Sequence, residues 1–168
     1  SENPIFLGEY NQAFKNSNFL LDFGYTEGYK KQTVKKTAGE KSHIFSKFVK
    51  NFYNDDESES TLSISFQDVS NDKYLKLYKI KSNLVDYETN NLESYLDFTH
   101  QNDVSFLGIN ASIYETLNDD YNDKYEYVLP EITFDRNLVS NESVGNLDLQ
   151  SNFKTHLYDT NKLTNIFV

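Results

Sequence analysis

The side chains that could do acid–base or metal chemistry are few and widely spaced in this 168-residue sequence. Its three histidines, His43, His100 and His156, stand far apart, and no Cys, Asp or Glu accompanies them at the spacing of a metal site. A lone His on a polar strand face is most often a solvated side chain, which is our interpretation of all three. Phosphate-binding, serine-hydrolase and zinc-protease motifs are also absent. We therefore assign no catalytic, cofactor-binding or metal-ligating residue and expect a protein that is not an enzyme.

Two acidic stretches, residues 54–59 and 118–123, are rich in carboxylate and amide oxygens. Hard divalent cations prefer such ligands, but neither stretch has the glycine and distal glutamate of an EF-hand loop. We favour solvated turns over cation sites at both places. Glu126 and Glu131 are predicted to lie on opposite faces of one strand, so they do not form the facing carboxylate pair of a glycosidase.

The net charge of −10 argues against a nucleic-acid partner, because nucleic-acid-binding proteins present a basic face. A solvated loop is the simplest interpretation of one basic run, and a patch that meets lipid phosphates is the alternative; the run comprises Lys30, Lys31, Lys35, Lys36 and Lys41. No run of about 18 apolar residues exists, so no transmembrane helix is predicted. The chain has no Met and its N-terminus lacks the features of a signal peptide, so we expect an internal fragment of a larger protein.

Alternation of apolar and polar residues with period 2 dominates the sequence and predicts β-strands. In residues 145–158, for example, Leu147, Leu149 and Phe153 fall on one face, while the other face is polar throughout. The segment 73–81 fits neither a strand nor a helix cleanly. Sequential strands predict one all-β unit over residues 1–168, an antiparallel up-and-down meander. We expect nine strands, near residues 4–14, 17–31, 43–54, 58–69, 88–100, 104–116, 124–135, 145–158 and 162–168.

The connections between the predicted strands alternate between short and long. Short turns on one rim and longer loops on the other are typical of outer-membrane barrels. The connection at 136–146 breaks the alternation, because it should be short and is not. Predicted strand lengths of about 10–14 residues also suit a tilted membrane-spanning strand better than a strand of a soluble sheet.

Pro130 stands in the middle of the predicted strand KYEYVLPEITF, where it cannot donate a hydrogen bond to a sheet. The alternation there is two-sided, with Tyr127 and Leu129 on one face and Ile132 and Phe134 on the other. We keep the strand and predict that Pro130 marks a bulge, a strand start or an unpaired position.

The order of these segments resembles the C-terminal barrel region of the LptD (OstA/Imp) family, the lipopolysaccharide-assembly proteins of Gram-negative outer membranes. The likeness covers nearly the whole chain, and its specificity comes from the order and spacing of degenerate motifs. The residues that carry it are Ser70-Asn-Asp-Lys-Tyr74 with Leu75 and Tyr78, then Leu92, Ser94 and Tyr95, then Leu129, Pro130, Glu131 and Ile132.

The resemblance implies an internal segment of a large outer-membrane β-barrel that passes lipopolysaccharide to the cell surface without enzymatic chemistry. It also implies partners: lipopolysaccharide, an LptE-like lipoprotein plug, periplasmic Lpt components and outer-membrane lipid. No catalytic residue is carried over. As a fragment, the sheet is expected to be curved and to hide its apolar face by curling on itself or by self-association.

A soluble β-sandwich or jelly-roll binding module, for example for carbohydrate, is the alternative. It predicts shorter strands and aromatic side chains exposed on a sheet face or loop tip.

Overall fold

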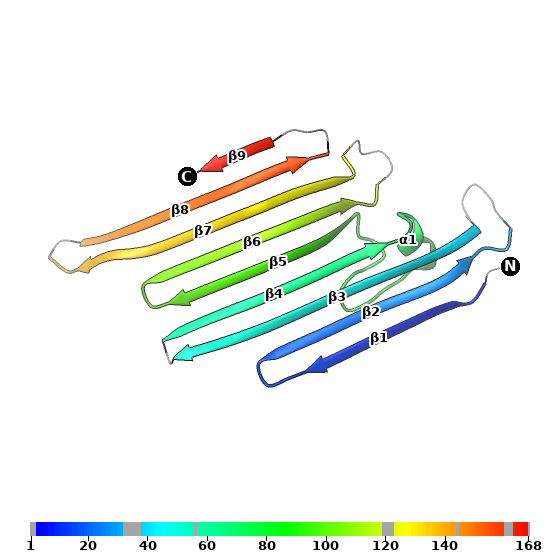
Figure 1. Cartoon of the computed structure of the whole chain (residues 1–168), viewed down its shortest axis with the longest axis horizontal. Coiled ribbons are helices and arrows are strands. Elements are labelled where there is room, and N and C mark those ends of the chain that lie inside the picture. The colour runs from blue at the N-terminus through cyan, green and yellow to red at the C-terminus, as the bar shows by residue number, and fades with distance from the viewer. Residues whose placement is uncertain are drawn as a thin grey trace.

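The computed structural model describes residues 3–31, 38–55, 57–118, 123–143, 145–159 and 163–167. They form one sheet of nine strands in chain order, each antiparallel to the next (Figure 1). This confirms the predicted antiparallel meander. The elements are β1 Ile5–Ala13, β2 Ser17–Gly28, β3 Ala38–Asp55, β4 Ser58–Val69, α1 Tyr74–Tyr78, β5 Asn91–Asn102, β6 Ser105–Thr116, β7 Tyr125–Asn141, β8 Gly145–Tyr158 and β9 Leu163–Phe167.

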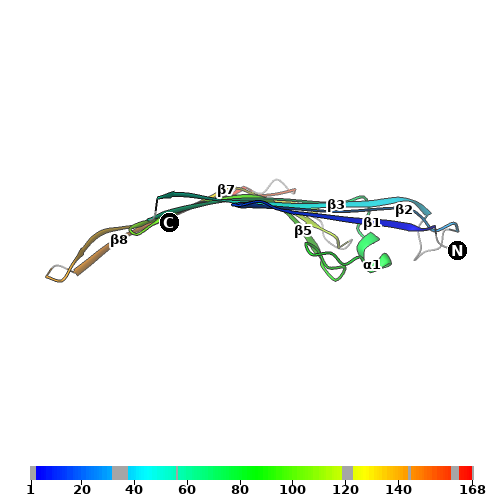
Figure 2. The ribbon, with the colours of Figure 1, turned by 90° about the horizontal axis from the view of Figure 1, so that it is seen from below.

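The sheet is open and one layer thick. β1 and β9 lie at its opposite sides (Figure 1), and the edge-on view in Figure 2 shows a single curved layer with α1 beneath it. Within the described residues no second sheet packs against it, as a sandwich would require. The described strands therefore do not fit the alternative of a β-sandwich.

The connections alternate more regularly than the sequence predicts. β7 continues past residue 135 to Asn141, so the connection to β8 is only residues 142–144. The predicted exception at 136–146 is therefore wrong. At one end of the sheet, consecutive strands are separated by two or three residues, and at the other end by four or more. The short separations are β1–β2, β3–β4, β5–β6 and β7–β8, and the longer ones are β2–β3, β4–β5, β6–β7 and β8–β9.

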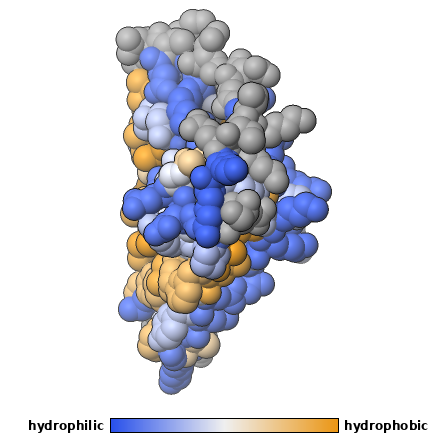
Figure 3. Space-filling model, turned by 90° about the vertical axis from the view of Figure 1, so that its right-hand side faces the viewer, coloured by the Kyte–Doolittle hydropathy of each residue, from blue (hydrophilic) through white to orange (hydrophobic). Residues whose placement is uncertain are grey.

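The strand register separates an apolar face from a polar face, because directly paired residues of an antiparallel ladder point to the same side. One row of the apolar face runs Leu62–Phe98–Ile109–Ile132–Phe153 across β4 to β8. One row of the polar face runs Ser63–Asp97–Asn110–Glu131–Lys154 across the same strands. Seen from the end, apolar residues gather along one margin of the thin molecule and the opposite margin is hydrophilic (Figure 3).

The main buried cluster lies where residues 70–90, which we call the strap, fold onto the polar face at the long-connection end of the sheet. α1 is a single short turn of helix in the strap, and its Tyr74 and Leu75 are buried. They pack with Phe45 and Val69 of the sheet. The segment 73–81, which fits no regular pattern in the sequence, is thus a short helix followed by a turn at Lys79, whose φ is +52°.

Candidate functional site

Large apolar side chains of the apolar face remain exposed. Phe66 of β4 is 48% exposed, and Leu96 of β5 is 45% exposed although it is paired with Ile64 on one side and Ala111 on the other. The strap packs on the other face around Phe45 (Figure 2), and its buried cluster also includes Leu92 at the start of β5. In other proteins, large exposed apolar patches often lie where a partner or a membrane binds.

The polar face is organised by cross-strand bonds. Lys154 Nζ lies 3.2 Å from a carboxylate oxygen of Glu131, and Asn152 Nδ2 donates to the Thr133 hydroxyl at 3.0 Å. Asn110 Nδ2 reaches Asp97 Oδ1 at 3.4 Å. Polar side chains of neighbouring strands are thus bonded to one another across this face.

A bulge at Pro130 keeps the β7 side chains on the faces set by the neighbouring strands. Between the pairs Val128–Ser112 and Glu131–Asn110, β7 has two residues where β6 has one, and the same excess holds against β8. The Leu129–Pro130 peptide bond is cis. Of the three predicted possibilities at Pro130, a bulge, a strand start or an unpaired position, the structure shows the bulge.

The bulge changes the faces on which the β7 side chains lie. Glu126 and Glu131 both point to the polar face, where they pair with Tyr158 and Lys154, so the prediction of opposite faces is wrong. Tyr127 and Ile132 both point to the apolar face, paired with Leu157 and Phe153. The apparent two-sided alternation arises because the extra residue reverses the parity halfway along the strand.

His43 is buried beneath the strap, which corrects the prediction that it is solvated. Its Nε2 lies 2.6 Å from Asp22 Oδ1 and its Nδ1 lies 3.1 Å from the Tyr74 hydroxyl. Both ring nitrogens of His43 therefore have a hydrogen-bond partner. Gly24 faces the ring directly, and a Cβ there would come within 2.5 Å of His43 Cε1, so glycine is what lets the ring lie flat across β2.

The other two histidines also have partners. Nδ1 of His100 lies 2.8 Å from the Ser60 hydroxyl on the apolar face. His156 Nε2 forms a short hydrogen bond with a carboxylate oxygen of Glu126 on the polar face. Both are partly exposed, so the solvated interpretation holds for them only in part.

Two further anchors hold the strap across the polar face. Asn83 Nδ2 donates to both carboxylate oxygens of Glu9 in β1, at 2.9 and 3.0 Å. Lys124 Nζ lies 2.5 Å from Asp72 and 3.1 Å from Glu115. Burial alone lowers the pKa of Lys124, but the two carboxylates outweigh it and raise the pKa. The strap therefore reaches from β1 to the β6–β7 connection.

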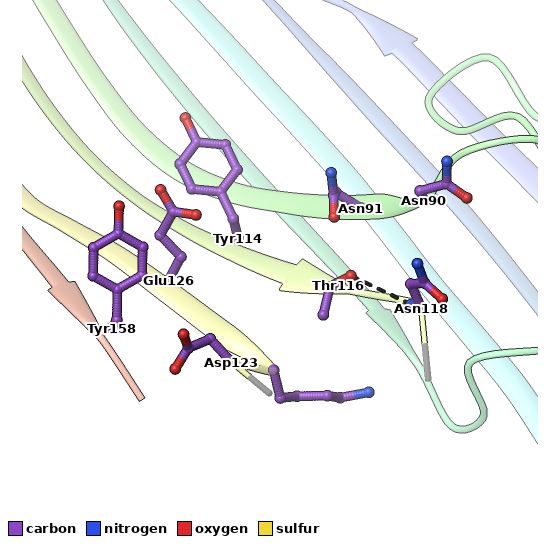
Figure 4. A pocket seen from close by; sticks show the side chains of 9 residues that line it. Asn90, Asn91, Tyr114, Thr116, Asn118, Asp123, Glu126 and Tyr158 are labelled. Atoms are coloured by element: carbon purple, nitrogen blue, oxygen red, sulfur yellow. Dashed lines mark hydrogen bonds between the residues drawn. The ribbon is translucent and has the colours of Figure 1, made fainter. Parts of the chain in front are cut away.

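A hollow of about 450 Å³ opens on the polar face beside the end of the strap (Figure 4). The sequence carries one signal of it, because Tyr158 is an aromatic residue at a polar-face position of β8. The lining residues are Asn90, Asn91, Tyr114, Thr116, Asn118, Asp123, Lys124, Glu126 and Tyr158.

The predicted acidic and basic stretches are only partly described. The side chains of residues 54–56 and the whole of 119–122 lie outside the described residues, as do Lys35 and Lys36. Lys41 belongs to β3 rather than to a solvated loop; it is buried, and its Nζ donates to the Gly39 carbonyl at 3.1 Å. In the part of the chain that the structure describes, no three His, Asp or Glu side chains come together as a metal site requires.

No helix in the described ranges has the length and hydropathy needed to cross a membrane. No protein-family model, curated protein or solved structure matches this chain. The functional assignment therefore depends on the geometry of the two faces and on the order of segments in the sequence.

Proposed function

We propose that this chain forms part of the wall of an outer-membrane β-barrel, with its apolar face against lipid and its polar face toward an aqueous lumen. The observation that carries the proposal is the separation of an apolar row from a polar row across β4 to β8, with large side chains of the apolar face exposed. A single sheet without a core beneath its apolar face needs another apolar phase to cover that face. Hydrocarbon tails supply one over the whole width of the sheet.

The strand lengths fit this environment. β2, β4, β5 and β6 each have 12 residues, and β3 has 18. At about 3.4 Å per residue, 12 residues extend about 40 Å, which a tilt of about 45° reduces to about 28 Å. That height matches the hydrocarbon thickness of a bilayer. Turns of two or three residues at one end and longer connections at the other match the two rims of such a barrel.

The direction of the outer strands determines how such a barrel closes. In a meander of nine strands β1 and β9 run the same way, as their arrows in Figure 1 show. Pairing them with each other would give a parallel seam in an antiparallel wall. Antiparallel closure instead takes an odd number of further strands between β9 and β1. The described sheet is therefore proposed to be one arc of a larger barrel.

The finer proposal is that this barrel assembles lipopolysaccharide at the cell surface. It rests on the resemblance to the LptD family, whose YVLPEITFD-like strand corresponds here to the bulged strand β7. The role is non-enzymatic lipid transport, and the partners are lipopolysaccharide, an LptE-like lipoprotein plug and periplasmic Lpt components. The bulge supports the resemblance, because the Leu129-Pro130-Glu131 segment keeps the β7 side chains before and after it on the same two faces.

Photo-crosslinking from two adjacent residues tests both levels of the proposal. Benzoylphenylalanine replaces either Thr133, on the polar face, or Phe134, on the apolar face, in protein inserted in the outer membrane of a Gram-negative cell. Lipid adducts at Phe134 are expected for any wall strand. Lipopolysaccharide adducts at Thr133 are expected only if lipopolysaccharide passes along the lumen, because resident membrane lipid cannot reach that side.

The two positions distinguish failure of the membrane assignment from failure of the transport role. Lipid adducts at Phe134 without lipopolysaccharide at Thr133 would leave a barrel wall and overturn lipopolysaccharide transport. An absence of lipid adducts at Phe134 would overturn the membrane assignment itself.

A further inference from the structure

The polar hollow beside the strap combines aromatic rings with hydrogen-bonding groups in one place. Tyr114, Glu126 and Tyr158 form a directly paired row across β6, β7 and β8. Figure 4 shows the two tyrosine rings on either side of the Glu126 side chain. His156 holds the Glu126 carboxylate, and the Tyr158 hydroxyl lies 3.5 Å from the other ring nitrogen of that histidine. The row is therefore a fixed platform of two rings and one carboxylate.

The far side of the hollow carries amides and a hydroxyl. Asn90 and Asn91 come from the end of the strap and the start of β5, while Thr116 and Asn118 come from the end of β6 and the residues after it (Figure 4). Side-chain amides present donors and acceptors together. A ligand between the two sides would thus meet rings on one side and both kinds of hydrogen-bonding group on the other.

The charge of the lining excludes most other ligand classes. The lining carries two carboxylates, Asp123 and Glu126, and one ammonium group, Lys124, which is itself paired with the carboxylates of Asp72 and Glu115. Such a lining repels phosphates and other anions. It also contains no aliphatic residue, so it offers little to a lipid tail. A neutral ligand with many hydroxyl groups is the class that fits.

We propose that this hollow binds a neutral saccharide, with a sugar ring stacked on Tyr114 or Tyr158 and its hydroxyls bonded to Glu126 and Asn91. The volume of about 450 Å³ falls in the range of small-molecule sites. The proposal deepens the proposed function and rests on it, because it names the part of a lipopolysaccharide-like molecule that the polar face recognises.

The test is a titration of the full chain, reconstituted in lipid nanodiscs, with maltotriose, cellotriose and chitotriose, followed by saturation-transfer NMR of the sugar. Saturable binding of at least one of these is expected. Tyr114→Ala and Tyr158→Ala are each expected to weaken it at least about tenfold, whereas Tyr158→Phe, which keeps the ring, stays within about threefold. Tyr53→Ala is the matched control, because Tyr53 is exposed on the polar face at the other end of the sheet.

Glu126→Gln keeps the size of the side chain and tests the site independently of the rings; it is also expected to weaken binding. No binding of any of the three sugars would overturn the proposal. So would binding that survives both the tyrosine variants and Glu126→Gln, or equal binding of the anionic trigalacturonate.

The outcome is separable from that of the crosslinking experiment. If none of the three sugars binds but lipopolysaccharide is still captured at Thr133, only the saccharide site is overturned. Sugar binding without that capture supports the site and overturns only the transport role.

Discussion

Asp22, His43 and Tyr74 join polar side chains of the sheet and the strap in a buried, hydrogen-bonded group. Each hydrogen bond there matters more than an exposed one, since a group left without its partner cannot turn to water. Burial, followed by the smaller effects of the nearby Tyr78 and Asp22, raises the pKa of Tyr74 to about 12. The Tyr74 hydroxyl therefore stays protonated and bonded to His43 well above neutral pH.

Tyr74→Phe is expected to lower the free energy of unfolding by about 1–2 kcal/mol, because it leaves Nδ1 of His43 buried without its hydrogen-bond partner. Urea titration of the chain in detergent micelles measures this change. Tyr53→Phe, at an exposed tyrosine, is the control and should change stability little. Equal stability of the two variants would contradict the role given to the Tyr74 hydroxyl.

The same tyrosine predicts a pH dependence. Its pKa is 10.0 in an unfolded chain and about 12 in the folded one, so the folded state holds the proton more tightly. The stabilisation is complete below pH 10 and is lost as the pH rises toward 12, by about 2 kcal/mol. Tyr74→Phe should lack this part of the loss, so its stability should fall less steeply between pH 10 and 12. Parallel pH profiles of the wild type and the variant would refute this.

β7 shows how one extra residue preserves the two faces of an element. Without the bulge at Leu129–Pro130, either Tyr127 or Ile132 would point to the polar face, because a shift of one residue reverses every side chain of a strand. The bulge lets both of them face the apolar side while Glu126 and Glu131 face the polar side.

Deletion of Leu129 should therefore lower the free energy of unfolding by about 3 kcal/mol or more, because the residues before Pro130 must then reverse their faces or lose their pairing. Leu129→Ala keeps the length of the strand and removes a side chain that is 40% exposed, so it should cost far less. Chemical unfolding of both variants in micelles makes the comparison. Similar stabilities would show that the bulge does not set the register.

Much of the fold follows from strand parity, and the exceptions have physical causes. The faces of β2, β4, β6 and β8 agree with their alternation, because nothing interrupts the period of 2. The sequence predicts a possible bulge at Pro130. It does not predict that the residues before and after Pro130 change faces, because that depends on how β7 pairs with both β6 and β8. The strap was not predicted because its anchor joins His43 to Tyr74, 31 residues away, and local pattern carries no information on such a contact. The same holds for the hollow, which four separate segments line.

For the molecule as a whole, the membrane assignment requires that lipid covers the apolar face. Phe98 and Thr99 are neighbours in β5 that point to the apolar and polar faces. Phe98→Arg should lower stability in a bilayer by about 2–4 kcal/mol, because a charge on the lipid side must leave water. Thr99→Arg should stay within about 1 kcal/mol. Urea unfolding of the chain in phospholipid vesicles compares the two, and an equal cost would show that lipid does not cover the apolar face.

The most direct test of a lipid-facing apolar face is to measure whether successive residues of β5 alternate between lipid and water. The chain has no cysteine, so Leu96→Cys, Asp97→Cys, Phe98→Cys and Thr99→Cys each provide a single site for a nitroxide spin label. In vesicles of phosphatidylcholine with lipopolysaccharide, the labels at 96 and 98 should be relaxed mainly by oxygen, which concentrates in lipid. The labels at 97 and 99 should be relaxed mainly by a water-soluble nickel chelate. Equal access of the chelate to all four sites, or the reverse alternation, would contradict a lipid-facing apolar sheet.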